Sequence, residues 1–221
     1  MKYTPAVSAL VALAPLVGAT DYTEPMAKQS SFQAFNLCVN VLGDQNSGPR
    51  FDPPIQDAYV NSLHVGAGLA LAQVTLDIGR VFYQNGTAAN AAATSIITDG
   101  GTPPFPEGLT VVPDDPAQPA LATVHIDSGA GTPGLNISPR PGPELRTSNT
   151  TDSGQFLACH EPIPYYSGAV FTVIKHLTPA TAPVPPECKA IQLFPKCTRL
   201  NDLPPGASSN HASVMQTECY F

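Results

Sequence analysis

The sequence contains no tryptophan, only three methionines and few charged residues, which make up 12% of its 221 residues. Basic residues are fewer than acidic ones: the sequence has ten Lys and Arg and 17 Asp and Glu, and its formal net charge is −7. Nucleic acids and anionic membranes attract proteins through clustered Lys and Arg. The charge balance therefore argues against both as partners.

Long hydrophobic runs are also missing. The main apolar stretch covers residues 6–17, follows the basic Lys2 and ends in Val17-Gly18-Ala19. A membrane span needs about 20 apolar residues, and this stretch is shorter. A basic start, an apolar stretch and small residues at its end are typical of a secretory signal peptide. The C-terminal residues 217–221 lack the tail of a lipid-anchor signal. We expect a signal peptide over residues 1–19 and a secreted, extracellular protein without a membrane anchor.

Enzyme signatures are absent as well. No G-x-S-x-G motif of a serine hydrolase occurs, and no two cysteines have the C-x-x-C spacing of a zinc site. Asp127-Ser128-Gly129 resembles the loop of an aspartic protease. The second Asp-Ser-Gly, at residues 152–154, follows too closely for each aspartate to end its own lobe. We expect no catalytic set, no cofactor and no metal.

Proline and glycine, by contrast, are abundant, with 25 and 17 residues. They separate short segments in which apolar and polar residues alternate, the period of a half-buried strand. Residues 87–100 have helical propensity, but they suit a loop and a short strand equally well. The clearest strands are predicted at residues 31–43, 59–76, 79–87, 95–98, 109–112, 121–126, 155–159, 169–175 and 190–194.

This pattern predicts an all-β fold. We expect a single domain over residues 32–221, after a flexible segment over residues 20–31. The domain should be a β-sandwich or barrel of about eight to ten short strands with Pro/Gly-rich loops.

The five cysteines predict disulfides in an oxidising compartment. Cys38 is the candidate for the unpaired thiol, because Phe35, Leu37 and Val39 share one strand face and Cys38 points to the other. The spacing leaves the connectivity of the other four open. They are expected to tie down the C-terminal segment through two disulfides, and they are Cys159, Cys188, Cys197 and Cys219.

Three Asn-x-Ser/Thr sequons accompany the predicted signal peptide. They predict N-glycosylation at Asn85, Asn149 and Asn136. Asn136 is the weakest acceptor, because Pro139 follows its sequon.

The segment SLHVGAGLALA, residues 62–72, is the first candidate for a site. His64 beside a flexible Gly66-Ala67-Gly68 backbone would suit a hydrogen bond or proton transfer to a ligand. Alternatively, Gly66 and Gly68 mark a bulge or a close approach of two backbones, and His64 donates to a carbonyl that holds the bend. The structural alternative is favoured, because a glycine within a strand usually marks such a bend.

The second candidate is the segment FLACHEPIPYY, residues 156–166. His160, Tyr165 and Tyr166 form the densest polar and aromatic cluster, and tyrosine rings suit stacking on a sugar face. The absence of Trp removes the strongest platform of this kind. The alternative is that one tyrosine belongs to the core and the other covers a sheet edge.

These segments, together with GRVFYQNGT, VPPECKAIQLFPKCTRLNDLP and a terminal CYF, resemble a family of small secreted proteins from filamentous fungi. No function is assigned to that family, and the resemblance covers residues 31–221. It implies a secreted, β-rich single domain and supplies no active site.

The sequence favours a secreted, non-enzymatic protein that binds a surface, at a cell wall, a carbohydrate or a host molecule. The expected partner is therefore a carbohydrate or an extracellular protein. One alternative is a secreted hydrolase that acts on carbohydrate or peptide, with His64, Asp127 or Glu161 as the residues to suspect. Another is a structural constituent of the cell wall without a discrete ligand.

Overall fold

The computed structural model describes residues 29–44, 48–117, 120–139, 141–148 and 153–221. The predicted signal peptide, residues 20–28 and the sequon at Asn149 lie outside this part of the chain.

The described residues form short strands, as the alternating sequence predicts, and the only helices among them are short 3-10 segments, η1 (Ala88–Ala93) and η2 (Pro164–Tyr166). No described helix has the length and apolarity of a membrane span. The strands are β1 (Gln29–Phe32), β2 (Ala34–Val41), β3 (Tyr59–Gly66), β4 (Leu69–Thr75), β5 (Phe82–Asn85), β6 (Ser95–Gly100), β7 (Phe105–Pro113), β8 (Leu121–Ser128), β9 (Leu135–Ile137), β10 (Leu145–Thr147), β11 (Gln155–Ile163), β12 (Ala169–Leu177), β13 (Cys188–Thr198) and β14 (Thr217–Tyr220).

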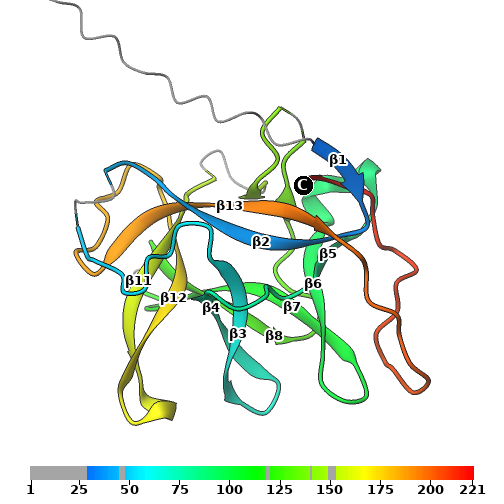
Figure 1. The fold of residues 1–221 in the computed structure, drawn as a ribbon, viewed down its shortest axis with the longest axis horizontal. Helices are drawn as coiled ribbons and strands as arrows, with labels where there is room; N and C mark the ends of the chain where they lie inside the picture. Colours follow the sequence, from blue (N-terminus) through cyan, green and yellow to red (C-terminus); the bar gives the residue numbers. More distant parts are fainter. Residues whose placement is uncertain (1–28, 45–47, 118–119, 140, 149–152) are drawn as a thin grey trace, which may run out of the picture.

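The main sheet closes on itself. β2 pairs with both β13 and β5, while β8 pairs with both β7 and β12. The pairings therefore form a ring through β2, β13, β11, β12, β8, β7, β6 and β5. Figure 1 shows β2 and β13 above β4, β7 and β8, so the ring is flattened into two facing layers. The predicted all-β sandwich or barrel is confirmed.

Two of the hairpins at the lower end of this body in Figure 1 carry the residues that the sequence singled out. β3 and β4 form one of them, and it joins the ring through single ladder pairs to β2, β12 and β8 and through a bond at its turn, from the Ser128 N–H to the Gly68 carbonyl at 2.8 Å. β11 and β12 form the other, paired from Gln155–Leu177 to Ile163–Ala169. The β11–β12 turn therefore lies beyond the ring pairings of its strands, while the β3–β4 turn is bonded to the end of β8.

The main hydrophobic core lies between the two layers. Phe35, Leu37 and Val39 of β2 are fully buried, as the alternation predicts, and Leu193 of β13 packs in the same cluster. Burying one side chain of this size stabilises a fold by about 1.5–3 kcal/mol. The closed ring is thus filled by apolar side chains and holds the bases of the hairpins in place.

Two disulfides fix the C-terminal strands. Cys159 on β11 pairs with Cys188 on β13, and Cys197 on β13 pairs with Cys219 on β14. The predicted stapling of the C-terminal segment is confirmed, and the second bond encloses residues 199–216, which we call the C-terminal loop. Cys38 is the free cysteine, and its burial raises the pKa of its thiol.

Three details differ from the predictions. Residues 29–31, assigned to the flexible segment, form β1 against β14. The strand predicted at residues 79–87 is shorter, since β5 covers Phe82–Asn85 and η1 separates it from its partner β6. Strands β9, β10 and β14 were not predicted, since three or four residues are too few for an alternating pattern to stand out.

Candidate functional site at the hairpin tips

The end of the β3–β4 hairpin exposes His64 and Leu69. The strand register shifts between His64 and Gly66, which confirms the predicted bulge. Gly68 has a φ of 70°, and a Cβ there would lie 3.2 Å from the Cβ of Ser128, so this position requires glycine. A Cβ on Gly66 would meet only ordinary contacts, and the close backbone approach is therefore at Gly68 alone.

The end of the β11–β12 hairpin exposes aromatic and aliphatic side chains. Pro164 begins η2, a position that suits its fixed φ, and Ser167 ends it with a φ of 56°. The Ser167 N–H donates to the Pro164 carbonyl at 3.0 Å, which closes the turn. The turn holds Tyr165 and Val170 outward, with 56% and 62% of their surfaces exposed.

Direct contacts join the two hairpin ends. The Tyr166 hydroxyl donates to the His64 backbone carbonyl at 2.8 Å. The His64 ring packs edge-on against Tyr165 with centroids 5.5 Å apart, and Tyr165 packs against Tyr166 at 5.2 Å. The structure thus brings together three residues that the sequence singled out in two separate segments.

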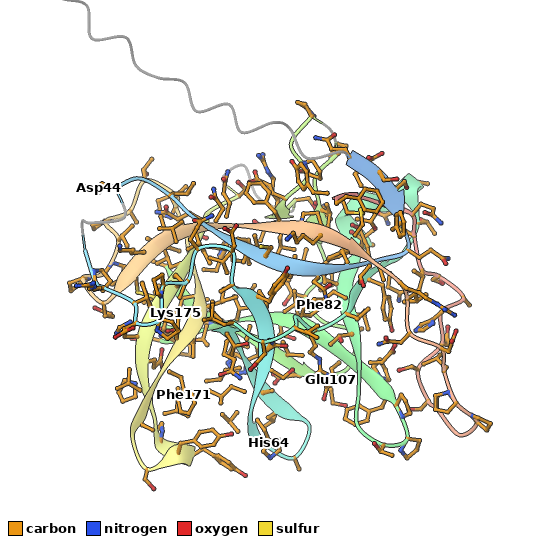
Figure 2. All side chains as sticks on the ribbon, viewed as in Figure 1. Asp44, His64, Phe82, Glu107, Phe171 and Lys175 are labelled. Carbon is orange, nitrogen blue, oxygen red and sulfur yellow. A yellow bond between two sulfur atoms is a disulfide. The ribbon has the colours of Figure 1, made fainter. Side chains whose placement is uncertain are left out.

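His64 itself has a different role from the structural one predicted for it. Among the described residues its imidazole makes no hydrogen bond, so it does not pin the bend by donating to a carbonyl. Its backbone carbonyl accepts the bond from Tyr166 instead, and its ring stays exposed at the lower end of the hairpin in Figure 2. The imidazole therefore remains available to a ligand.

A small apolar cluster lies beneath these contacts and is separate from the main core. It holds the two hairpins against each other, and Figure 2 shows one of its members, Phe171, on the hairpin next to His64. Its buried residues are Leu63, Leu71, Ile163 and Val173, with Val65, Tyr166 and Phe171 packed against them.

We define the hairpin-tip surface as the outer side chains of His64, Leu69, Tyr165, Tyr166 and Val170. Leu69 is 50% exposed, and neither residues 62–70 nor residues 163–170 include an Asp, Glu, Lys or Arg. Single exposed apolar residues are ordinary, but a gathering of them marks an interaction surface. Aromatic and aliphatic area with one imidazole and the Tyr165 hydroxyl suits an uncharged ligand that has apolar faces and hydroxyl groups.

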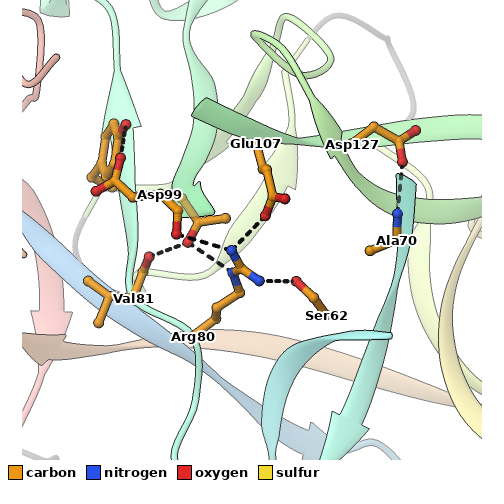
Figure 3. A network of polar contacts seen from close by, with 9 residues as sticks. Ser62, Ala70, Arg80, Val81, Asp99, Glu107 and Asp127 are labelled. Carbon is orange, nitrogen blue, oxygen red and sulfur yellow. Dashed lines mark hydrogen bonds and ion pairs between the residues drawn. The ribbon is translucent and has the colours of Figure 1, made fainter. Parts of the chain in front are cut away.

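Arg80 holds the base of the β3–β4 hairpin, as Figure 3 shows. Its guanidinium donates to Ser62 Oγ of β3 at 2.5 Å, to Glu107 Oε2 of β7 at 2.6 Å and to Thr98 Oγ1 of β6 at 3.2 Å. Charge-assisted bonds of this kind are stronger than neutral ones. One side chain therefore ties three strands together below the hairpin tip.

The charges in this clamp are largely removed from water. Burial lowers the pKa of Arg80, while the charges of Glu107 and Asp99 act in the opposite direction. The ordinary pKa of arginine lies so high that the group stays charged at neutral pH. The side chains of Arg80 and Glu107 are only 23% and 12% exposed, so each is the main compensation for the other's charge.

His160 does not join the tyrosines, although it lies in the same sequence segment. Its ring packs edge-on against Phe51 with centroids 4.4 Å apart, and its backbone N–H donates to the Glu187 carbonyl at 3.0 Å. His160 is thus anchored away from the hairpin tips, and the ligand-binding cluster predicted from this segment is only partly formed.

The residues suspected of hydrolase chemistry are not assembled into one site. Asp127 Oδ1 accepts from the Ala70 N–H at 3.2 Å (Figure 3), and Glu161 Oε2 lies 2.6 Å from Lys175 Nζ. Within the described residues, no hydrogen bond or ion pair links His64, Asp127 and Glu161 to one another.

Glu161 instead belongs to an ion-pair network around Lys175. Lys175 is 9% exposed, and its Nζ also lies 2.8 Å from Asp114 Oδ2. Burial by itself would lower the pKa of Lys175, but its hydrogen bonds to Asp114 and Glu161 outweigh this, and the pKa is raised. The lysine is therefore a cation at neutral pH and pairs with both carboxylates.

The described sequons differ in accessibility. Asn136 lies on β9 and is only 9% exposed, which argues against a glycan at this predicted site. Asn85 ends β5 beside the exposed Thr87, and its glycosylation stays a prediction. No group of three or more His, Cys, Asp or Glu among the described residues is placed to hold a metal ion.

Sequence reasoning missed Leu69, Val170 and Arg80. Leu69 follows Gly68, and Val170 follows Gly168-Ala169, so apolar side chains stand directly beside turns, where polar residues are expected. That pattern was the available signal. Arg80 offered none, because its partners come from three other segments.

Comparison with known proteins places the chain in a sequence family. Residues 33–197 match a family described as Domain of unknown function (DUF7907). The chain is also similar to "Antigenic protein SchS34" of Stachybotrys chartarum, with 40% identity over 200 residues, which cover 86% of this chain and 87% of that protein. No solved structure matches. These matches confirm the resemblance to fungal proteins of unassigned function.

Proposed function

The chain belongs to the DUF7907 family, and we propose that it is a secreted, non-enzymatic protein that binds cell-wall polysaccharide through the hairpin-tip surface. The observation that carries this proposal is the exposure of Tyr165, Val170 and Leu69 at one end of the molecule, on turns without a charged side chain.

These side chains have no folding role that accounts for their exposure. The main core and the small cluster beneath the tips are formed by other residues, so burial of Leu69 and Val170 stabilises neither. Exposed apolar groups lower solubility unless a partner covers them. The exposure of Tyr165, Val170 and Leu69 therefore supports the proposal that these side chains contact a partner.

The chemistry of the surface favours a polysaccharide. Sugar rings offer apolar C–H faces to an aromatic ring and hydroxyl groups to its rim. Tyr165 supplies the ring, and its hydroxyl and the His64 imidazole supply polar groups beside it. Wall polymers such as chitin and β-glucan are uncharged, which suits a surface without acidic or basic side chains.

An extracellular location is consistent with the two disulfides and with a relative described as an antigenic protein. Disulfides of this kind persist in oxidising compartments and are rare in the cytosol. The predicted signal peptide over residues 1–19 is the route by which the chain would reach that location.

The test is a pelleting assay with insoluble chitin, β-1,3-glucan and cellulose. The secreted protein is incubated with each polymer. The protein retained in the pellet and the sugar released into the supernatant are then measured. We expect saturable retention on at least one polymer, no released sugar, and loss of retention in Tyr165→Ala.

Ile78→Ala is the matched control, because Ile78 is 92% exposed and apolar but lies outside the hairpin-tip surface. It should be retained like the wild type. Equal retention of both variants would refute the proposed surface. Sugar released in proportion to protein and time would replace the proposal by a hydrolase, and retention that resists high salt and free sugars would favour a structural wall constituent.

A further inference from the structure

A groove of about 600 Å³ lies along the start of the C-terminal loop, away from the hairpin-tip surface. This volume is within the range of about 300–1,000 Å³ that is usual for small-molecule sites. Its wall combines apolar area from Phe32 and Leu203 with polar side chains that include Gln33, Asn201 and His211. The groove therefore offers both kinds of contact that a polar organic ligand needs.

His211 in this groove is oriented by a buried carboxylate. Asp99 on β6 is only 5% exposed in its side chain, and its Oδ2 lies 3.0 Å from His211 Nε2. Its other oxygen accepts from the Tyr83 hydroxyl at 3.2 Å. Burial and the charge of Asp99 raise the pKa of Tyr83, so the phenol remains a donor.

This arrangement leaves one hydrogen-bond acceptor of defined direction. A carboxylate accepts the Nε2–H, so the neutral imidazole carries its unprotonated nitrogen at Nδ1. The Tyr83 ring packs edge-on against the imidazole with centroids 5.0 Å apart and restricts its rotation. Within the described residues, Nδ1 makes no hydrogen bond.

The C-terminal loop is attached to the body by other contacts besides the His211–Asp99 bond. Two backbone bonds hold the loop at β5. The Met215 N–H donates to the carbonyl of Gln84 on β5 at 2.9 Å, and the N–H of Gly86, just after β5, donates to the Ser213 carbonyl at 3.0 Å. The Cys197–Cys219 disulfide closes its base. Loop anchoring therefore uses Nε2 of His211, and the oriented Nδ1 is left for a ligand.

The groove favours a neutral ligand. Its charged side chains include Arg199 and Asp202, which pair with each other at 3.1 Å and cancel in net charge. Amide and hydroxyl side chains make up most of the remaining polar lining. Such a lining matches the alternating donors and acceptors of sugar hydroxyls, while Phe32 and Leu203 offer area to the faces of the rings.

We propose that this groove is a second binding site, which takes a soluble, neutral oligosaccharide. His211 Nδ1 accepts a hydrogen bond from a sugar hydroxyl, and the side-chain amide of Asn201 exchanges hydrogen bonds with a neighbouring hydroxyl. Asp99 is a positioning residue, because it fixes the tautomer and direction of His211 without touching the ligand. The site does not depend on the proposed function of the hairpin-tip surface.

The test is an NMR titration of the full-length protein at neutral pH. The probes are chitohexaose, laminarihexaose and an uncharged hexapeptide of serine and glycine. We expect saturable shifts at His211 and Asn201 with a hexasaccharide and none with the peptide. Asp99→Asn should move the imidazole proton to Nδ1, as seen in the ring nitrogen shifts, and weaken binding about tenfold, since one hydrogen bond is lost.

A second variant covers the case in which Asp99→Asn fails to fold. Asn201→Ala changes an exposed loop residue and should also weaken binding about tenfold. Shifts confined to Tyr165 and its neighbours would overturn the second site and leave the hairpin-tip proposal intact. Binding of the peptide alone, no binding by any probe, or a changed tautomer with unchanged affinity would each overturn it as well.

Discussion

The closed body and the two hairpin ends are built from the same short strands, but they are stabilised differently. The body combines the main apolar core, two disulfides and the buried Arg80 clamp. The hairpin ends are joined by one small apolar cluster and the bond from Tyr166 to His64. The comparison teaches that most apolar residues of the body form its core, whereas at the tips several exposed apolar side chains lie on two neighbouring turns.

The polar residues show the same contrast. In the body, the least exposed charged groups are paired with each other, as Arg80 is with Glu107 and Lys175 with Glu161. At the tips, the His64 imidazole has no hydrogen-bond partner among the described residues. Groups that remain unpaired on a well-ordered turn are the ones that a ligand can engage, so the proposed wall binding belongs to the tips.

Breaking the clamp should have the largest effect on stability. Arg80→Met leaves the Glu107 carboxylate largely buried without its partner, and we expect the free energy of unfolding to fall by about 3–5 kcal/mol. Arg199→Met is the control, because the Arg199–Asp202 pair is exposed and should contribute less than about 0.5 kcal/mol. Urea unfolding followed by circular dichroism measures both, and equal losses would contradict the account.

Alkaline pH should weaken the body through Tyr83. The folded state raises the pKa of this phenol, through burial and the charge and hydrogen bond of Asp99. The unfolded chain therefore loses the proton first, and stability falls as the pH rises above about 10. Between pH 10 and 11 the loss in wild type should exceed that in Tyr83→Phe by about 1 kcal/mol. Parallel pH profiles of the two proteins would be inconsistent with a raised pKa.

Separating the two hairpins should have a modest effect. Tyr166→Phe removes only the hydroxyl that donates to the His64 carbonyl. We expect a loss of about 1 kcal/mol in the free energy of unfolding and faster hydrogen exchange in residues 62–70, without change in β2 or β13. Faster exchange throughout the barrel would indicate that the hairpin ends and the body are one cooperative unit.

Tyr165→Ala should have the smallest effect on stability and a large one on binding. Its side chain is more than half exposed, so the free energy of unfolding should change by no more than about 0.5 kcal/mol. Affinity for the wall polymer should fall about 30-fold, the effect of a residue that contributes about 2 kcal/mol of binding energy. A variant that unfolds easily and binds normally would reverse the assignment of roles.

Local pattern was enough to predict much of the fold. The alternation around Phe35, Leu37 and Val39 gave the buried face of β2, and the glycines after His64 gave the bulge. The odd cysteine also followed from strand alternation, since Cys38 remains free. These features depend on residues within a few positions of each other, which the sequence displays directly.

Features that depend on distant residues were beyond prediction. Tyr166 and His64 are 102 residues apart, and Asp99 and His211 are 112 residues apart. Only the packing of strands that are far apart in the sequence brings them together. His160 was grouped with the tyrosines because it is near them in sequence, but it lies within β11 while they lie on η2 beyond the end of that strand, and its ring packs against Phe51 instead.

The most direct test of the central claim is hydroxyl-radical footprinting of the wild-type protein bound to the wall polymer that retains it best. Oxidation of exposed side chains is compared between the bound and free protein by mass spectrometry. The account predicts protection of Tyr165, Leu69 and Val170, with Ile78 and Phe221 oxidised as in the free protein. Protection of Ile78 or Phe221 with the hairpin-tip surface still reactive would contradict it.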